Sequence, residues 1–357
     1  MKTLRPVAIL VSGLMGTVAA RAQTPLTPPG AATAPAENRP AAAKAKPPAA
    51  TKKPAAPPPR PIPNPAPATT AAPAAPPGDP NADLVYGAYQ RGQYRTAFDL
   101  ATKRAQEAGD PKAMTMLGEL YANALGVARD DAKAAGWYRR AADSGDREAM
   151  FALAMLRLSG RGGPVNHEEA ARLLASSAKL GNPKAAYNLA LLYLDGQTLP
   201  QDLRRAAELF RVAADAGNPE AQYALATFYK EGTGVEKNIE KAVRLLQAAS
   251  LADNVDAEVE YAIALYNGTG TPKNEAAAVA LLRKAARQNS PIAQNRLARV
   301  LVTGQGAPVD KIEGLKWHLV AKTAGKGDPM LDEALAQSAP EERARAEAAA
   351  RRWVGAK

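Results

Sequence analysis

The chain has 357 residues and no cysteine, which excludes disulfides, thiol catalysis, cysteine-ligated zinc and a lipid-modified N-terminal cysteine. Its net charge is +11, of which residues 1–22 carry +3 and residues 23–78 carry +5, so that only +3 remains for residues 79–357. A solenoid that binds nucleic acid would concentrate positive charge in its folded part. The charge distribution therefore argues against nucleic-acid binding.

Residues 1–22 have the pattern of a secretory signal peptide. Lys2 and Arg5 form a positive start, residues 7–20 are an apolar stretch, and Ala20-Arg21-Ala22 fits a small-x-small cleavage site. An uncleaved membrane anchor is the weaker alternative, because a span needs about 20 apolar residues. We expect an exported protein, in the periplasm of a Gram-negative bacterium, with secretion as the alternative.

Residues 23–78 consist mostly of proline and alanine. Proline removes backbone donors and alanine offers little apolar surface, so the segment is expected to be a disordered linker with polyproline II character. A passive spacer is the favoured interpretation. The alternative is weak, salt-sensitive attraction to anionic cell wall or polysaccharide. That attraction would come from the basic residues Lys44, Lys46, Lys52, Lys53 and Arg60.

Residues 79–110 are predicted to form an N-terminal helix pair. Asp79-Pro80 has the pattern of an N-cap followed by proline in the first helical position. The first helix should end near Arg91, before a break at Gly92, and the second should run over residues 94–108.

Residues 111–326 contain six repeats of 36 residues. Two series of residues with helix-capping side chains recur at that step. One series is Asp110, Asp146, Asn182, Asn218, Asn254 and Ser290, and the other is Asp130, Asn166, Asp202, Asn238, Asn274 and Asp310. Two capped helices per repeat predict an all-α fold, a right-handed α/α solenoid of helix pairs.

A third series with the same step contains bulky residues in the second helix of each repeat. Its members are Trp137, Leu173, Leu209, Leu245, Leu281 and Trp317. One helix pair cannot bury its apolar face alone, so these residues predict a core that continues along the stack.

Residues 327–357 are predicted to form C-terminal capping helices. A break near residues 325–329 precedes a helix over residues 330–337, and Ser338 is placed to cap a final, largely polar helix. A polar outer face is what the end of a solenoid needs.

The repeat resembles the Sel-one-like repeat (SLR), a relative of the tetratricopeptide repeat. The first repeat carries the pattern at Ala113, Leu117, Gly118, Tyr121, Gly126, Val127, Asp130, Ala134, Trp137, Tyr138, Ala141, Ala142 and Gly145. The resemblance covers roughly residues 80–326 and implies an exported bacterial scaffold. Cysteine-stapled relatives, some of which bind β-lactams, are a poorer match because this chain has no cysteine.

No catalytic constellation is found in the sequence. The two histidines, His167 and His318, lie 151 residues apart and are expected to be solvent-exposed or packed at an edge. Neither a His-Glu-x-x-His zinc pattern nor a Gly-x-Ser-x-Gly nucleophile turn occurs. The sequence therefore predicts no enzyme, no metal and no cofactor.

The resemblance implies that the first helices line a groove and that exposed positions there contact a partner. Some relatives use an asparagine at the sixth position of a repeat to hold a peptide backbone, which indicates Asn188 together with Lys184. Arg296 and Arg299 are expected to receive an acidic segment, and Glu260 occupies the sixth position of the fifth repeat.

Three functions remain after these considerations. The leading one is an exported, regulatory scaffold for a protein partner, such as an envelope or membrane signalling protein, bound in the groove. The second is a wall or polysaccharide binder that acts through residues 23–78. An envelope hydrolase of the β-lactam-binding type is the least favoured.

Overall fold

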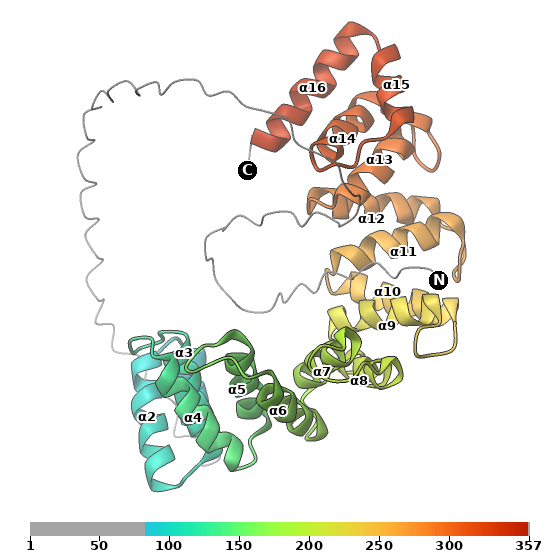
Figure 1. Ribbon diagram of the computed structural model, residues 1–357. Coiled ribbons are helices and arrows are strands. Elements are labelled where there is room, and N and C mark those ends of the chain that lie inside the picture. Colours follow the sequence, from blue (N-terminus) through green and yellow to red (C-terminus); the bar gives the residue numbers. More distant parts are fainter. Residues whose placement is uncertain (1–82, 356–357) are drawn as a thin grey trace, which may run out of the picture. The chain divides into compact units, whose positions relative to one another are not determined.

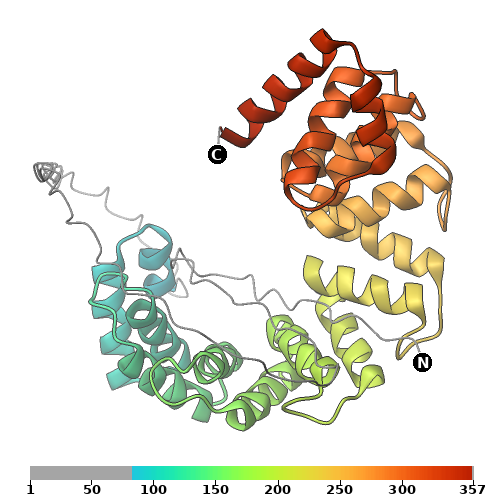
Figure 2. The same cartoon turned by 45° about the horizontal axis from the view of Figure 1, so that its top comes forward.

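The computed structural model describes residues 83–355, so the predicted signal peptide and the Pro/Ala-rich segment lie outside the described residues. The described part contains sixteen helices, and consecutive helix pairs lie side by side in chain order (Figure 1, Figure 2). This arrangement confirms the predicted all-α fold of helix-pair repeats. No helix among residues 83–355 is both long and apolar enough to span a membrane.

The N-terminal pair consists of α1 (Leu84–Gln90) and α2 (Tyr94–Glu107). The first helices of the six repeats are α3 (Pro111–Ala122), α5 (Arg147–Ser159), α7 (Pro183–Asp195), α9 (Pro219–Glu231), α11 (Val255–Asn267) and α13 (Pro291–Thr303). The second helices are α4 (Asp131–Asp143), α6 (His167–Lys179), α8 (Leu203–Asp215), α10 (Ile239–Leu251), α12 (Glu275–Arg287) and α14 (Lys311–Thr323). The chain continues with α15 (Pro329–Gln337) and α16 (Pro340–Gly355).

All twelve predicted capping residues of the six repeats are confirmed as N-caps. Each side-chain oxygen accepts a hydrogen bond from a backbone N–H two or three residues further on. Asp146, for example, accepts from the N–H of Ala149 at 2.7 Å. These bonds satisfy donors that the first helical turn leaves without a partner, which is why the capping residues fix the helix starts.

The capping prediction for Ser338 is wrong, whereas the helix start predicted at Asp79-Pro80 lies outside the described residues. The first described helix begins at Leu84, and Asp83 accepts from the N–H groups of Val85 and Tyr86. The hydroxyl of Ser338 donates to the carbonyl of Ala334 at 2.7 Å, so it ends α15 and does not cap α16.

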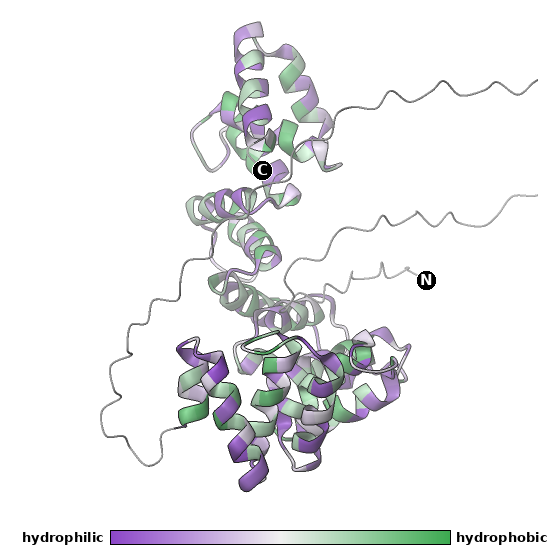
Figure 3. Cartoon of the chain, turned by 90° about the vertical axis from the view of Figure 1, so that its left-hand side faces the viewer, coloured by the Kyte–Doolittle hydropathy of each residue, from purple (hydrophilic) through white to green (hydrophobic). Residues whose placement is uncertain are grey.

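The fully buried series of the core lies one residue beyond the predicted one. Trp317 is buried, but the other five members of the predicted series are only half buried. The next position in each second helix is at most 5 % exposed: Tyr138, Leu174, Phe210, Leu246, Leu282 and His318. In Figure 3 the helices carry hydrophobic residues beside hydrophilic ones, in keeping with packing on one side.

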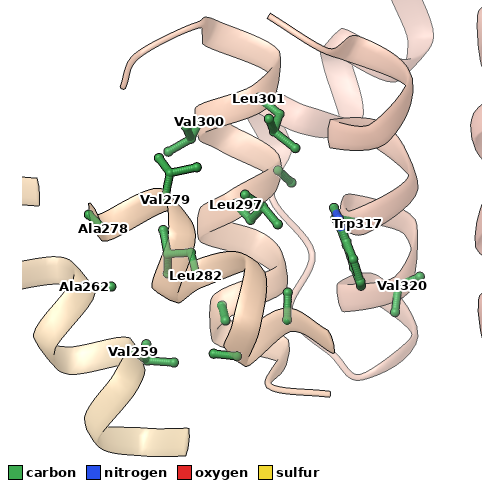
Figure 4. Close-up of a cluster of buried hydrophobic side chains, with 14 of the residues drawn as sticks. Val259, Ala262, Ala278, Val279, Leu282, Leu297, Val300, Leu301, Trp317 and Val320 are labelled. Atoms are coloured by element: carbon green, nitrogen blue, oxygen red, sulfur yellow. The ribbon is translucent and has the colours of Figure 1, made fainter. Parts of the chain in front are cut away.

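Alanine fills much of the space between neighbouring helices. In the cluster near the C-terminal end of the repeats, Ala262, Ala278 and Ala298 have no exposed surface. Figure 4 shows Leu282 and Leu297 close to one another among the buried side chains of α11 to α14. Small residues let the helices approach closely, and the larger aliphatic side chains fill the remaining volume.

The loop between the two helices of a repeat lies against the start of the preceding second helix. A Cβ on Gly162 would lie 2.2 Å from the Asp131 carbonyl oxygen, and a Cβ on Gly234 would lie 2.3 Å from that of Leu203. Both glycines also have a positive φ, near 68°. In the third repeat, Thr198 occupies the position of this glycine.

The C-terminal helices close the stack by two different contacts. Helix α16 packs on α14, where the rings of Trp317 and Trp353 meet edge to face at 5.0 Å. The ammonium of Lys316 lies 3.9 Å from the Trp317 ring centre, and burial lowers the pKa of this lysine. Helix α15 is attached through the carboxylates of Asp328 and Asp332, which bond to α13 and α14 respectively.

Candidate functional site

A pocket of about 230 Å³ lies between the first helices of the fifth and sixth repeats, α11 and α13. It is also bordered by α12, by the loop after α13 and by α15. Its lining residues are Ala262, Ile263, Tyr266, Asn267, Leu282, Arg296, Arg299, Val300, Thr303, Gln305 and Met330. Two of the five predicted contact residues, Arg296 and Arg299, therefore line one pocket.

The interior of this pocket, which we call the α11–α13 pocket, is apolar and its edge is polar. Leu282 and Val300 are buried, and Ile263 is half buried. The hydroxyl of Tyr266 donates to the backbone carbonyl of Gln305 at 3.3 Å, which ties α11 to the loop after α13. The pocket can thus take an apolar group while polar groups meet it at the edge.

Arg299 is about half exposed but has a charged partner within the protein. It forms an ion pair with Asp328, whose side chain is only 2 % exposed and which is the N-cap of α15. Burial alone would raise the pKa of Asp328, but hydrogen bonds from Arg299 and Asn295 and the charge of the arginine outweigh it and hold this pKa below its usual value. Arg299 therefore fixes the start of α15 and, with it, the adjacent pocket residue Met330.

Arg296 and Arg299 are both exposed, but Arg296 differs because it has no hydrogen-bond or ion-pair partner among residues 83–355. One repeat earlier, Lys230 and Glu260 pair at 3.1 Å, at the positions that Tyr266 and Arg296 occupy here. The lysine and carboxylate neutralise one another there. Tyrosine cannot do this for Arg296, which leaves a cation at the edge of the pocket.

The structure does not bring the other predicted contact residues into this pocket. Glu260 pairs with Lys230, and each side chain keeps more than a third of its surface exposed. Lys184 is exposed on α7, and the amide of Asn188 donates to the carbonyl of Lys184 at 2.8 Å. The side-chain oxygen of Asn188 is therefore left to accept a hydrogen bond from another donor.

The prediction for His167 is confirmed, since it is exposed at the start of α6. For His318 the solvent-exposed alternative is wrong, because this residue has no exposed surface. Its Nε2 lies 2.9 Å from the carboxylate of Asp332, on α15. The histidine occupies the last place in the buried core series and links that core to α15.

A second cavity, of about 650 Å³, opens where Thr198 replaces the loop glycine. It lies between the loop after α7 and the start of α6, next to His167 and Glu168. Among residues 83–355 there is no group of three or more histidine, aspartate or glutamate side chains placed to hold a metal ion.

Sequence reasoning missed Tyr266, Gln305, Met330 and Asp328. The Asp328-Pro329 pair has the same cap-and-proline pattern as Asp110-Pro111, and this was the available signal for a helix start there. The other three residues come from separate elements, and only the packing of α15 and the loop onto α13 brings them together.

Comparisons with known proteins agree with this architecture. The family model described as "Sel1 repeat" matches residues 111–146, 147–182, 183–218, 219–254, 255–290 and 291–326. A Sel1 repeat protein from Oxalobacter formigenes is similar in structure, with 24 % identity and a TM-score of 0.59 over 67 % of this chain and 98 % of that one.

A protective antigen of uropathogenic Escherichia coli strains that displays an SLR fold is also similar. It shares 26 % identity and a TM-score of 0.55 over 75 % of this chain and 67 % of that chain. No curated protein sequence matches this chain. Because the family model covers six consecutive segments and more than half of the sequence, the chain belongs to the Sel1 repeat family.

Proposed function

We propose that this chain is an exported regulatory scaffold that holds a protein partner against the first helices of its repeats. Sel1 and tetratricopeptide-like repeat proteins are typically non-catalytic scaffolds for protein interactions. Export is supported by the pattern of residues 1–22. An envelope or membrane signalling protein is the partner that this location favours.

The observation that carries the proposal is the α11–α13 pocket. It lies between two first helices, its interior is apolar, and at its edge stands a cation that has no partner among residues 83–355. Desolvated apolar pockets with a nearby arginine are the kind of surface that contributes most to protein binding. No comparable observation favours the envelope hydrolase.

The test is a capture experiment with the full chain and with residues 79–357. Each is immobilised, a detergent-solubilised envelope extract is passed over it, and the retained proteins are identified by mass spectrometry. We expect one dominant protein with both forms. If this protein is no longer retained after charge reversal at Lys184 and replacement of Asn188, the contact surface extends to the third repeat.

Two results would count against the proposal. Retention of no protein by either form would contradict a protein scaffold. Binding of purified wall material by the full chain, lost without residues 23–78, would instead favour the wall or polysaccharide binder.

A further inference from the structure

We propose that the α11–α13 pocket binds a partner segment in which an apolar side chain lies next to a carboxylate. This inference rests on the proposed function, because it names the chemistry of the segment that the scaffold holds.

The volume of about 230 Å³ suits one large side chain. Sites for drug-sized ligands start at about 300 Å³. Leu282, Val300 and Ile263 supply an apolar lining, and Met330, 38 % exposed, supplies a flexible apolar wall. A leucine or phenylalanine side chain would replace water there, and each such burial contributes about 1.5–3 kcal/mol before the costs of binding.

The charges at the edge select an anion. Within the described part of the chain, the only charged residues lining the pocket are Arg296 and Arg299, and the second is already neutralised by Asp328. The guanidinium of Arg296 can donate two parallel hydrogen bonds to one carboxylate. A carboxylate adjacent to the buried side chain would therefore meet an arginine that has no competing partner within residues 83–355.

The charge of the chain's own Pro/Ala-rich segment disfavours it as the occupant. Residues 23–78 carry six basic residues and a single acidic one, Glu37. Like charges at close range oppose docking of this segment beside Arg296. A separate partner with an acidic, apolar segment fits the pocket better.

Arg299 acts as a positioning residue in this proposal. Its ion pair with Asp328 holds the first turn of α15, and Met330 is the second residue of that helix. Loss of the pair would release the Met330 wall without removing the cation that reads the carboxylate. Binding should then weaken while the preference for an acidic segment remains.

The test uses the full chain with 13C-labelled isoleucine and methionine methyl groups and capped synthetic peptides Gly-Ser-X-Z-Ser-Gly. X is Leu, Phe or Gly, and Z is Asp, Asn or Lys. We expect Leu-Asp and Phe-Asp peptides to shift the methyl signals of Ile263 and Met330 in a saturable way. Replacing Asp by Asn should weaken binding about tenfold, and replacing Leu by Gly should abolish it.

Three variants sharpen the result. Arg296→Glu should lose the Leu-Asp peptide and gain the Leu-Lys peptide, whereas Lys112→Glu, an exposed charge reversal on α3, should change nothing. Arg299→Ala should move the Met330 signal in the free protein and weaken binding with the Asp preference intact. Arg299→Lys should partly restore the position of the Met330 signal and the strength of peptide binding.

The inference is overturned if no peptide shifts these methyl signals, if Asp and Asn peptides bind equally, or if Arg296→Glu leaves binding unchanged. The capture experiment tests the scaffold function independently of the pocket. A partner captured equally well by the full chain and by its Arg296→Glu variant would leave the scaffold function standing and place the contact elsewhere. Peptide binding to the pocket, if no protein is captured from the extract, would support the pocket's preference for an acidic, apolar segment and contradict the scaffold function.

Discussion

Arg157 on α5 and Glu169 on α6 form an ion pair, with 2.9 Å between Nε and Oε2, at positions where three other repeats stack a cation on a tyrosine. The distances from the cation to the ring centre in those repeats are 5.5 Å for Lys133 and Tyr121, 5.1 Å for Arg205 and Tyr193, and 5.4 Å for Lys241 and Tyr229. The second repeat therefore replaces both partners together and keeps an attraction between its two helices.

Replacing Arg157 by alanine should lower the free energy of unfolding by about 1–3 kcal/mol, measured by urea denaturation. The arginine and glutamate side chains are only 13 % and 21 % exposed, so solvent screens their attraction less than at the surface. The control is Arg351→Ala, which breaks an ion pair with Glu347 at an arginine that is 71 % exposed. That change should cost less than about 0.5 kcal/mol, and equal losses in the two variants would contradict the argument.

The contribution of Glu169 should depend on pH. Burial raises the pKa of this carboxyl, but Arg139 and Arg157 outweigh it and leave the pKa below its usual value. A carboxyl with a lowered pKa in the folded state stabilises the protein fully above its unfolded pKa, about 4.3, and loses that effect as pH falls through the folded pKa. The difference in unfolding free energy between the native chain and Glu169→Gln should therefore be largest near pH 6 and shrink below about pH 4. A difference that stays constant down to pH 3 would exclude this ionisation as the cause.

Gly118→Ala should destabilise the first repeat, although both residues are compatible with a helix. A Cβ at this position would lie 2.5 Å from Cε1 of the buried Tyr138 ring, and overpacking of this kind costs about 1–3 kcal/mol. Gly136→Ala, on α4, is the matched control because nothing lies within 4 Å of its added Cβ. It should raise the unfolding free energy by about 0.5–1 kcal/mol through helix propensity alone. A thermal melt of both variants checks the opposite signs, and a rise for Gly118→Ala would contradict the packing argument.

The helix starts and the repeat length could be predicted from the sequence because capping is local chemistry. Asp146 contacts an N–H only three residues away, and this spacing is visible in the chain. The buried series could not be separated from its neighbour, because Leu209 and Phe210 are both apolar and only packing shows that Phe210 is the fully buried one. The same limit applies to the pocket, where Arg296 and Arg299 look alike until Asp328 is placed beside one of them.

Glu258 on α11 is a fully buried carboxylate in a position that two other repeats fill with glutamine. Its Oε1 lies 2.7 Å from the ammonium of Lys284. The amides of Gln222 and Gln294 instead donate to the carbonyls of Ala214 and Ala286, at 3.2 and 3.1 Å, at the end of the preceding second helix. The carbonyl at the corresponding position for Glu258 belongs to Ser250.

We expect Glu258→Gln to leave the unfolding free energy unchanged or to raise it by about 1 kcal/mol, because an amide can donate to that carbonyl without burying a charge. Lys284 would keep its pair with Asp253, at 2.5 Å. The reverse change, Gln294→Glu, should lower the unfolding free energy by about 1–3 kcal/mol. In the sixth repeat Val320 stands at the position that corresponds to Lys284, so the new carboxylate would have no lysine there. Urea denaturation of the two variants separates these outcomes. A loss above about 2 kcal/mol for Glu258→Gln would show that the repeat depends on the ion pair with Lys284 rather than on a polar group that merely fits the position.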